Sequence, residues 1–223
     1  MGEPAFSDAE YLSRQSAFLD QLPEDSLVLI PTNQVAYRSN DTHFPFRANS
    51  YMLYLCGWSD PEAVLMAHCN DTEWVTTLFV QPRDTKAEIW EGRRVGVEGA
   101  VSGWPVDQAR SLDDLSDIVK SRLETCSSVY TVSEINGKID SLIADSNTEV
   151  SDPRPFLDKM RRIKSTGEIE LMSQSAEIAS SAHIEAMRAS YAGIGEWEIQ
   201  SAIEGHFLKC KSQWSYPSIV GGG

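Results

Sequence analysis

The spacing of the apolar residues changes near residue 160, and this change limits the possible folds more than any other feature of the sequence. Before it, apolar runs of strand length alternate with segments whose apolar residues recur every three or four positions, as in a helix. After it, the helical spacing dominates. This pattern predicts the α/β class: a small mixed α/β domain over residues 1–150, a proline-containing linker at 151–159, and the truncated start of a second domain at 160–223.

The predicted strands of the first region are short apolar runs bounded by Gly, Pro or polar residues. They are Leu27–Ile30, Tyr51–Cys56, Ala63–His68, Trp74–Val80 and Val129–Val132. The length and aromatic content of the run at 51–56 predict a central strand, so that residues 51–80 form a meander. Helices are predicted to begin at the capping sequences Ser7–Glu10 and Ser111–Asp114, and a further one lies at 135–144.

The second region begins with a capping box, Ser165 to Glu168, which predicts a helix that continues to Arg188. A second amphipathic helix is predicted over residues 197–208, and residues 215–220 predict the edge of a strand. The apolar face of the first helix is predicted to consist of Ile169, Met172, Ala176, Ala179, His183 and Met187. Nothing that follows could pair with the strand or cover the helices, so we expect the chain to be the N-terminal part of a longer protein.

The charge balance argues against two classes of partner. The chain has 33 acidic and 19 basic residues, and the resulting formal net charge of −14 repels nucleic acid and anionic membranes on average. There is no apolar leader and no stretch of about 18 apolar residues. The four cysteines form no C-x-x-C pair and are predicted to be reduced thiols. We therefore expect a cytoplasmic protein that binds neither nucleic acid nor a membrane.

A search for catalytic residues finds no active site in the sequence. Among the four histidines, only His206 has a second His or Cys at helical spacing, namely Cys210 four residues later. Two ligands are one short of a catalytic zinc site. His183 and His206 are predicted to be either core histidines with satisfied ring nitrogens or histidines that support a site without binding its metal. No G-x-S-x-G sequence and no glycine-rich phosphate loop is present.

Three long motifs nevertheless identify a family. They are RSNDTHFPFRANSYMLYLCGWSDPEAVLM at 38–66, QPRDTKAEIWEGRR at 81–94 and MRRIKSTGEIELMSQSAEIASSAHIEAMR at 160–188. In this order they resemble the aminopeptidase P (Xaa-Pro aminopeptidase) family of proline-specific metalloaminopeptidases. The resemblance implies a small α/β N-terminal domain followed by an α+β catalytic domain of the pita-bread fold.

The resemblance also implies a cofactor that this chain does not bind. In the family two divalent cations, usually manganese, are held by two Asp, one His and two Glu residues that follow the segment corresponding to SYPSIVG at 215–221. No metal ligand and no catalytic residue can therefore be assigned to this chain, which we expect to be inactive alone. The substrate implied for the parent protein is a peptide with proline at its second position.

Two residues match family positions that close the substrate cleft of a neighbouring subunit. By resemblance, Trp90 in the E-I-W-E-G-R-R motif and Asp41 are implied to be substrate-binding, in a homo-oligomer that is a dimer or a tetramer. The alternatives are that Trp90 fills a domain interface and that Asp41 is a turn residue. Two other functions also stay open: an Xaa-Pro dipeptidase of the prolidase type, and a non-catalytic peptide-binding scaffold with the same fold.

Overall fold

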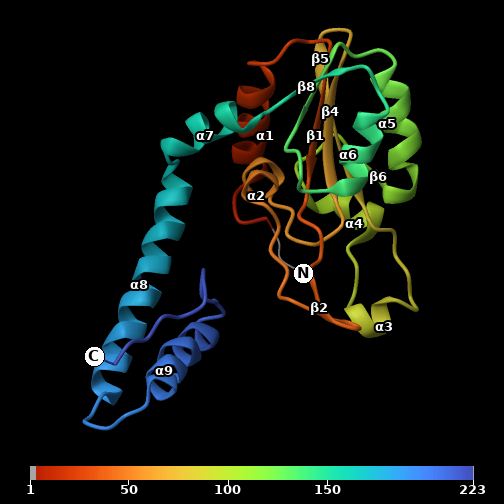
Figure 1. Cartoon of the computed structure of the whole chain (residues 1–223). Coiled ribbons are helices and arrows are strands. Elements are labelled where there is room, and N and C mark those ends of the chain that lie inside the picture. Colours follow the sequence, from red (N-terminus) through yellow and green to blue (C-terminus); the bar gives the residue numbers. More distant parts are fainter. Residues whose placement is uncertain (1–3, 223) are drawn as a thin grey trace. The chain divides into compact units, whose positions relative to one another are not determined.

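The computed structural model describes residues 4–222 of the chain. The chain divides into two compact units, residues 1–162 and residues 163–223, which are described separately below. Unit 1 is built around a sheet and unit 2 consists of helices (Figure 1). In the part of the chain that the structure describes, no helix has the length and apolarity needed to cross a bilayer.

Unit 1 contains a six-stranded sheet in the order β6, β5, β4, β1, β7, β8. Its strands are β1 (Ser26–Pro31), β4 (Val64–Asn70), β5 (Glu73–Val80), β6 (Gln108–Ser111), β7 (Ser128–Thr131) and β8 (Glu149–Ser151). β4 is antiparallel to both of its neighbours, whereas the pairs β5 with β6, β1 with β7 and β7 with β8 are parallel. The carboxyl ends of five of these strands, all but β4, therefore lie at one edge of the sheet.

Helices cover both faces of this sheet (Figure 1). One face packs against α1 (Asp8–Leu19), α2 (Ser50–Cys56), α4 (Gly96–Gly103) and α7 (Arg154–Arg162), and the other against α5 (Leu115–Leu123) and α6 (Gly137–Ala144). Along β1 the pleat sends Val28 and Ile30 to the first face and Leu27 and Leu29 to the second, and all four are buried. A strand buried on both faces reads as a continuous apolar run, which is why the sequence predicted it. The predicted mixed α/β class is confirmed.

The strand predicted over Tyr51–Cys56 is wrong, because these residues form helix α2. The Asn49 side chain accepts from the backbone N–H groups of Tyr51 at 3.0 Å and Met52 at 2.8 Å, which caps the first turn. Gly57, with a φ of 71°, ends the helix in the left-handed conformation. An apolar run of this length fits a strand or a buried helix equally well, and its two caps decide for the helix. The predicted meander is therefore only the β4–β5 hairpin.

The segment predicted as a linker, 151–159, lies within unit 1. It contains the end of β8 and most of α7, which packs on α1. Leu157 is completely buried in the first core, and the Tyr51 hydroxyl donates to Asp158 Oδ1 at 3.0 Å. The two units divide at residue 162, whereas the predicted boundaries lie at 150 and 160. Pro153 directly precedes α7 and Pro155 lies in its first turn, where a proline removes no helical hydrogen bond.

Unit 2 contains α8 (Thr166–Ala189) and α9 (Glu196–Lys209), packed against each other. The predicted capping box is confirmed: Glu168 N donates to Ser165 Oγ at 3.1 Å, and Ser165 N donates to Glu168 Oε2 at 2.9 Å. On the predicted apolar face of α8, Ile169, Met172 and Met187 are 56%, 57% and 68% exposed, so the described part of the chain leaves much of this face uncovered.

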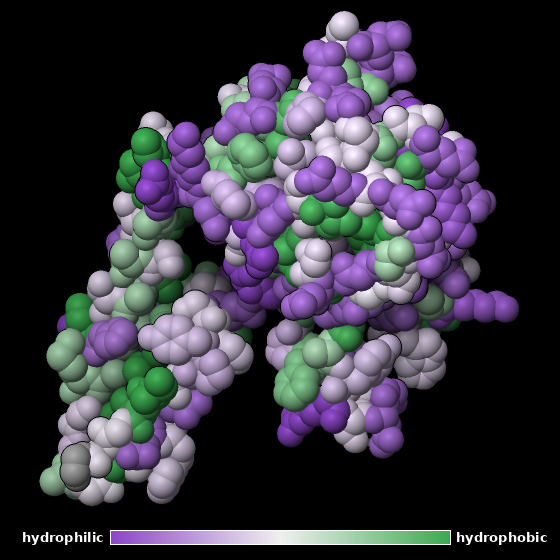
Figure 2. All heavy atoms as spheres, turned by 45° about the horizontal axis from the view of Figure 1, so that its top comes forward, coloured by the Kyte–Doolittle hydropathy of each residue, from purple (hydrophilic) through white to green (hydrophobic). Residues whose placement is uncertain are grey.

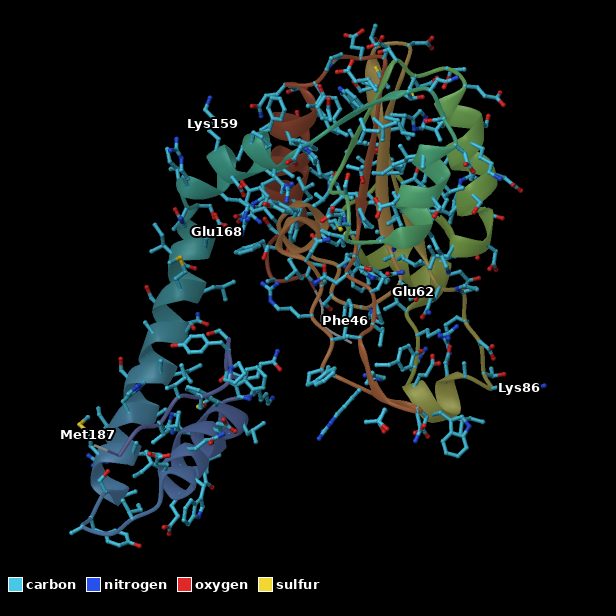
Figure 3. All side chains as sticks on the ribbon, in the orientation of Figure 1. Phe46, Glu62, Lys86, Lys159, Glu168 and Met187 are labelled. Carbon is cyan, nitrogen blue, oxygen red and sulfur yellow. The ribbon has the colours of Figure 1, made fainter. Side chains whose placement is uncertain are left out.

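The face of α8 that is buried contains Ala182 and Ala186, because two small side chains allow α9 to approach closely. Met187 points outward near the end of α8 (Figure 3), and Figure 2 shows several apolar patches on the surface of unit 2. The face predicted for α9 is confirmed as partly buried; it consists of Ile199, Ala202, Ile203 and Phe207.

The strand predicted over residues 215–220 is not formed. A strand needs a neighbour for its backbone groups, and unit 2 offers none among the described residues. The segment is held by side chains of α9: Ser218 Oγ donates to Glu204 Oε1 at 2.8 Å, and Gly222 N donates to Glu196 Oε1 at 2.6 Å.

Candidate functional site

Two loops at one edge of the sheet carry the residues implied to bind substrate. β1 and β5 are parallel to each other because each is antiparallel to β4. At their carboxyl ends the chain continues into β2 (Tyr37–Ser39) and β3 (Thr42–His43) after β1, and into α3 (Glu88–Glu91) after β5. Both excursions lie beyond the same end of the sheet in Figure 1. Asp41 and Trp90 are therefore placed at the edge where open α/β sheets bind ligands.

The loop that carries Trp90 is braced by its own ion pairs. The Arg83 guanidinium donates to both carboxylate oxygens of Glu88, with Nη2 2.8 Å from Oε2, and this hydrogen-bonded pair lowers the pKa of Glu88. Arg94 Nη2 donates to Glu91 Oε2 at 2.7 Å. The two pairs fix α3 from both sides, so Trp90 is presented on a defined turn of helix.

The turn before α3 is also fixed, by the carboxylate of Asp84. Asp84 Oδ1 accepts from Lys86 N at 2.9 Å and from Ala87 N at 3.2 Å. Hydrogen bonds from Ala87 and Lys86 lower the pKa of Asp84, so the carboxylate stays charged and keeps both donors. Lys86 itself projects away from the sheet (Figure 3).

Large apolar side chains are exposed on both loops. Trp90 is 90% exposed and Ile89 is 75% exposed, while Tyr37 and Phe44 on the other loop are 71% and 52% exposed. Side chains exposed to this degree are available for contact with a partner or a ligand. An indole can contribute apolar contact area and a planar wall, but it supplies neither a nucleophile nor a general base.

Asp41 is exposed in the turn that joins β2 and β3. Its neighbour Asn40 has a φ of 48°, the left-handed conformation that Asn tolerates in a hairpin turn. The same position thus fits the turn-residue alternative, and the structure brings Asp41 and Trp90 only to the same edge of the sheet.

A cleft of about 410 Å³ lies at this edge as well, between the ends of β5 and β6 and the start of α6. Arg94, Lys138, Glu62 and Asp113 line it, and Lys138 Nζ is 4.0 Å from Glu62 Oε2. Two cations and two anions give the cleft no net charge, so it favours neither an anionic nor a cationic ligand.

The histidines belong to no metal centre with three or more ligands among the described residues. Among residues 4–222, no group of three or more His, Cys, Asp or Glu side chains is placed to hold a metal ion. Burial lowers the pKa of His68. The core alternative for His183 is wrong, because the side chain is exposed; its Nδ1 lies 2.8 Å from the Ala179 carbonyl oxygen one turn earlier.

His206 is mostly buried, as predicted, and the structure adds a residue that the sequence did not indicate. His206 Nε2 lies 3.6 Å from Cys210 Sγ, which agrees with their helical spacing. His206 Nδ1 lies 3.0 Å from Glu185 Oε1, and Glu185 belongs to α8. Only the packing of α9 on α8 brings this carboxylate to the ring.

Comparisons with known proteins agree along nearly the whole chain. A family model described as "Aminopeptidase P, N-terminal domain" matches residues 11–132. The Xaa-Pro aminopeptidase of Haemophilus influenzae is 35% identical, over 96% of this chain and 51% of its own length, and that of Escherichia coli is 30% identical, over 97% and 53%. The chain spans about half the length of the curated relatives that it matches.

The fold is similar to that of solved structures from the same group. Aminopeptidase P of Escherichia coli in its low-pH form superposes with a TM-score of 0.86 at 29% identity, over 92% of this chain and 50% of that one. Proline aminopeptidase P II of Yersinia pestis gives a TM-score of 0.85 at 30% identity, over the same 92% and 50%. Sequence and fold therefore point to one family.

Proposed function

Because the chain belongs to the aminopeptidase P family, we propose that it supplies the N-terminal half of an Xaa-Pro aminopeptidase. This exopeptidase hydrolyses the bond between the first residue of a peptide and a proline at the second position. The observation that carries the proposal is the agreement with named Xaa-Pro aminopeptidases over almost every residue of the chain, in both sequence and fold.

The metal ions of the reaction are proposed to bind outside this sequence. The described residues do not fit a centre of two cations, since no three suitable side chains converge in residues 4–222. Two manganese ions held by the remaining half of the polypeptide would activate water and polarise the scissile carbonyl when bound. The 223-residue chain alone is accordingly proposed to be inactive.

The role proposed for unit 1 is to close the substrate cleft of a neighbouring subunit in a homodimer or homotetramer. Trp90 is the main contact, with Asp41 on the adjoining loop at the same sheet edge. The braced α3 loop supports this role, because a loop that its own ion pairs already hold loses little backbone freedom when a partner covers the exposed indole. Covering it would contribute about 1.5–3 kcal/mol.

The setting proposed for the protein is the cytoplasm. All four cysteines are free thiols in the structure, which fits a reducing compartment. The formal net charge of −14 argues against nucleic acid as a partner.

The test uses the polypeptide with the full length of its relatives, loaded with manganese. Ala-Pro-Ala is expected to be cleaved and Ala-Ala-Ala to be left intact. Cleavage of the dipeptide Ala-Pro alone would instead identify a prolidase, and no cleavage of any peptide would favour the scaffold. Trp90→Ala should lower kcat/KM about 10- to 100-fold, in line with the burial energy, at unchanged metal content.

Leu12→Ala is the matched control for that variant. Leu12 is also an exposed apolar residue of unit 1, at 48%, but it lies on α1, away from the α3 loop. It should leave kcat/KM unchanged. If Trp90→Ala and Leu12→Ala have the same kcat/KM in an intact oligomer, Trp90 does not contribute to the substrate cleft. The aminopeptidase assignment is tested separately, by the cleavage of Ala-Pro-Ala.

A further inference from the structure

A cysteine, a histidine and a glutamate form a cluster on the two helices of unit 2. Cys210 Sγ lies 3.6 Å from His206 Nε2, and His206 Nδ1 lies 3.0 Å from Glu185 Oε1. Cys210 and His206 are one helical turn apart at the carboxyl end of α9, and Glu185 projects from α8. The imidazole thus stands between a thiol and a carboxylate, with a different ring nitrogen facing each.

The environment of the ring fixes its tautomer. The His206 side chain is only 15% exposed, and Nδ1 is buried with no hydrogen-bond partner in the described chain besides the nearby Glu185 carboxylate. A carboxylate cannot donate, so the proton belongs on Nδ1, where Glu185 stabilises it. Nε2 is then left with a free lone pair that faces Cys210 Sγ, the arrangement in which histidines bind metals.

The separation of the two donor atoms matches a shared metal ion. Zinc binds thiolate sulfur at about 2.3 Å and imidazole nitrogen at about 2.0–2.1 Å, so tetrahedral angles place the two atoms about 3.5 Å apart. The observed Sγ to Nε2 distance is 3.6 Å. The carboxyl end of α9 also carries the negative end of the helix dipole, which favours a cation there.

From this geometry we propose that Cys210 and His206 form a binding site for a thiophilic divalent cation such as Zn²⁺ or Co²⁺, oriented by Glu185. The thiol proton passes to solvent when the thiolate binds. The remaining coordination positions are taken by water, because Cys210 borders an open groove of about 580 Å³ through which the ion can enter. Lys211 borders the same groove, and its repulsion makes the site one of moderate affinity.

The experiment is a Co²⁺ titration of the 223-residue chain under a phosphine reductant, followed by absorption. Co²⁺ replaces Zn²⁺ in such sites and reports a thiolate ligand as a near-ultraviolet charge-transfer band. We expect one such band that saturates at one ion per chain, disappears in Cys210→Ser and is displaced by Zn²⁺. Glu185→Gln should weaken binding about 10- to 100-fold, as the loss of a carboxylate behind a metal-bound histidine usually does.

Two further variants make the result decisive. Cys69→Ser is the matched control, because Cys69 is a thiol near Asp71 and Glu24 and could attract a cation by charge alone; this variant should keep the full band. His206→Gln should lose most of the affinity while its far-ultraviolet circular dichroism stays unchanged. A band that persists in Cys210→Ser, or equal affinity in His206→Gln and the unsubstituted chain, would overturn the site. The absence of any band at millimolar Co²⁺ would identify a hydrogen-bonded thiol that binds no metal.

Discussion

The two units of this chain bury their apolar residues to very different degrees. Unit 1 encloses its sheet between two helical layers, and Leu29, Ile30 and Phe79 are completely buried. In unit 2, the buried hydrophobic residues among those described are Ala182 and Ala186, and Ile169 and Met172 on α8 are more than half exposed. Unit 1 therefore has a core of its own, whereas the helices of unit 2 present apolar faces that could pack against further structure.

Because of this difference, unit 1 can serve as a rigid scaffold, whereas unit 2 presents an apolar surface. The stability of unit 1 comes from side chains between layers, so its edge loops can present Trp90 on a fixed support. Helices such as α8 and α9 owe most of their stability to tertiary packing, and two alanines bury little area. We expect the two units to respond very differently to the same perturbation.

Hydrogen exchange should show the largest contrast. Amides of β1 and β4 open only when unit 1 unfolds, which costs roughly 5–15 kcal/mol in a typical domain. Every residue from 169 to 177 in α8 is exposed, so amides there should open locally. In the 223-residue chain we expect exchange at least about a thousandfold slower in β1 than at 169–177. Equal protection would show that unit 2 is stabilised by packing that the exposed residues do not reveal.

The second-largest contrast is expected in the loss of stability when one apolar side chain is truncated in each unit. Phe79 is fully buried between β5 and the second helical layer, so Phe79→Ala should cost unit 1 about 3–5 kcal/mol. Ile169→Ala in unit 2, at a 56% exposed position, should change stability by less than about 0.5 kcal/mol. Urea unfolding followed by near-ultraviolet circular dichroism measures unit 1, because the ring centroids of Trp58 and Trp104 lie 4.8 Å apart there. Amide exchange in α8 measures unit 2. Similar losses of stability in both variants would contradict the comparison.

The sequence predicted the parts of the fold that depend on local pattern. β1, β4, β5 and β7 were expected because apolar runs bounded by turn residues are typical of strands buried on both faces. The Ser165 capping box was found for a similar reason, since both of its partners lie within four residues. The sequence did not show which residues of α8 pack against α9, because this contact depends on how the two helices meet.

The candidate sites show the same limit. The motif containing Trp90 and the spacing of His206 and Cys210 can be read from the chain, because each is local. Strand directions, which no local pattern specifies, place Asp41 and Trp90 at one edge of the sheet. Glu185 lies 21 residues before His206 on another helix, so only the folded unit shows that its carboxylate faces the ring.

The smallest contrast is expected between alanine substitutions at two glycines, one in each unit. It tests how the end of α2 is held, the helix that forms where a strand was predicted. Gly57 and Gly193 both have positive φ angles, 71° and 93°, so alanine at either position costs about 1–2 kcal/mol of backbone strain. A Cβ at Gly57 would also lie 2.5 Å from Tyr11 Oη and 2.9 Å from Tyr11 Cζ, whereas one at Gly193 would meet nothing within 4 Å.

Tyr11 is 1% exposed, so its ring cannot move aside without disturbing α1. We therefore expect Gly57→Ala to destabilise unit 1 by about 2–5 kcal/mol, the strain plus the overpacking, and Gly193→Ala to cost unit 2 only the strain. Urea titrations of the two variants, each read in the unit that carries the change, measure the difference. Equal losses would mean that the contact between Gly57 and Tyr11 adds nothing, and that α2 is held by its Asn49 cap and its buried face alone.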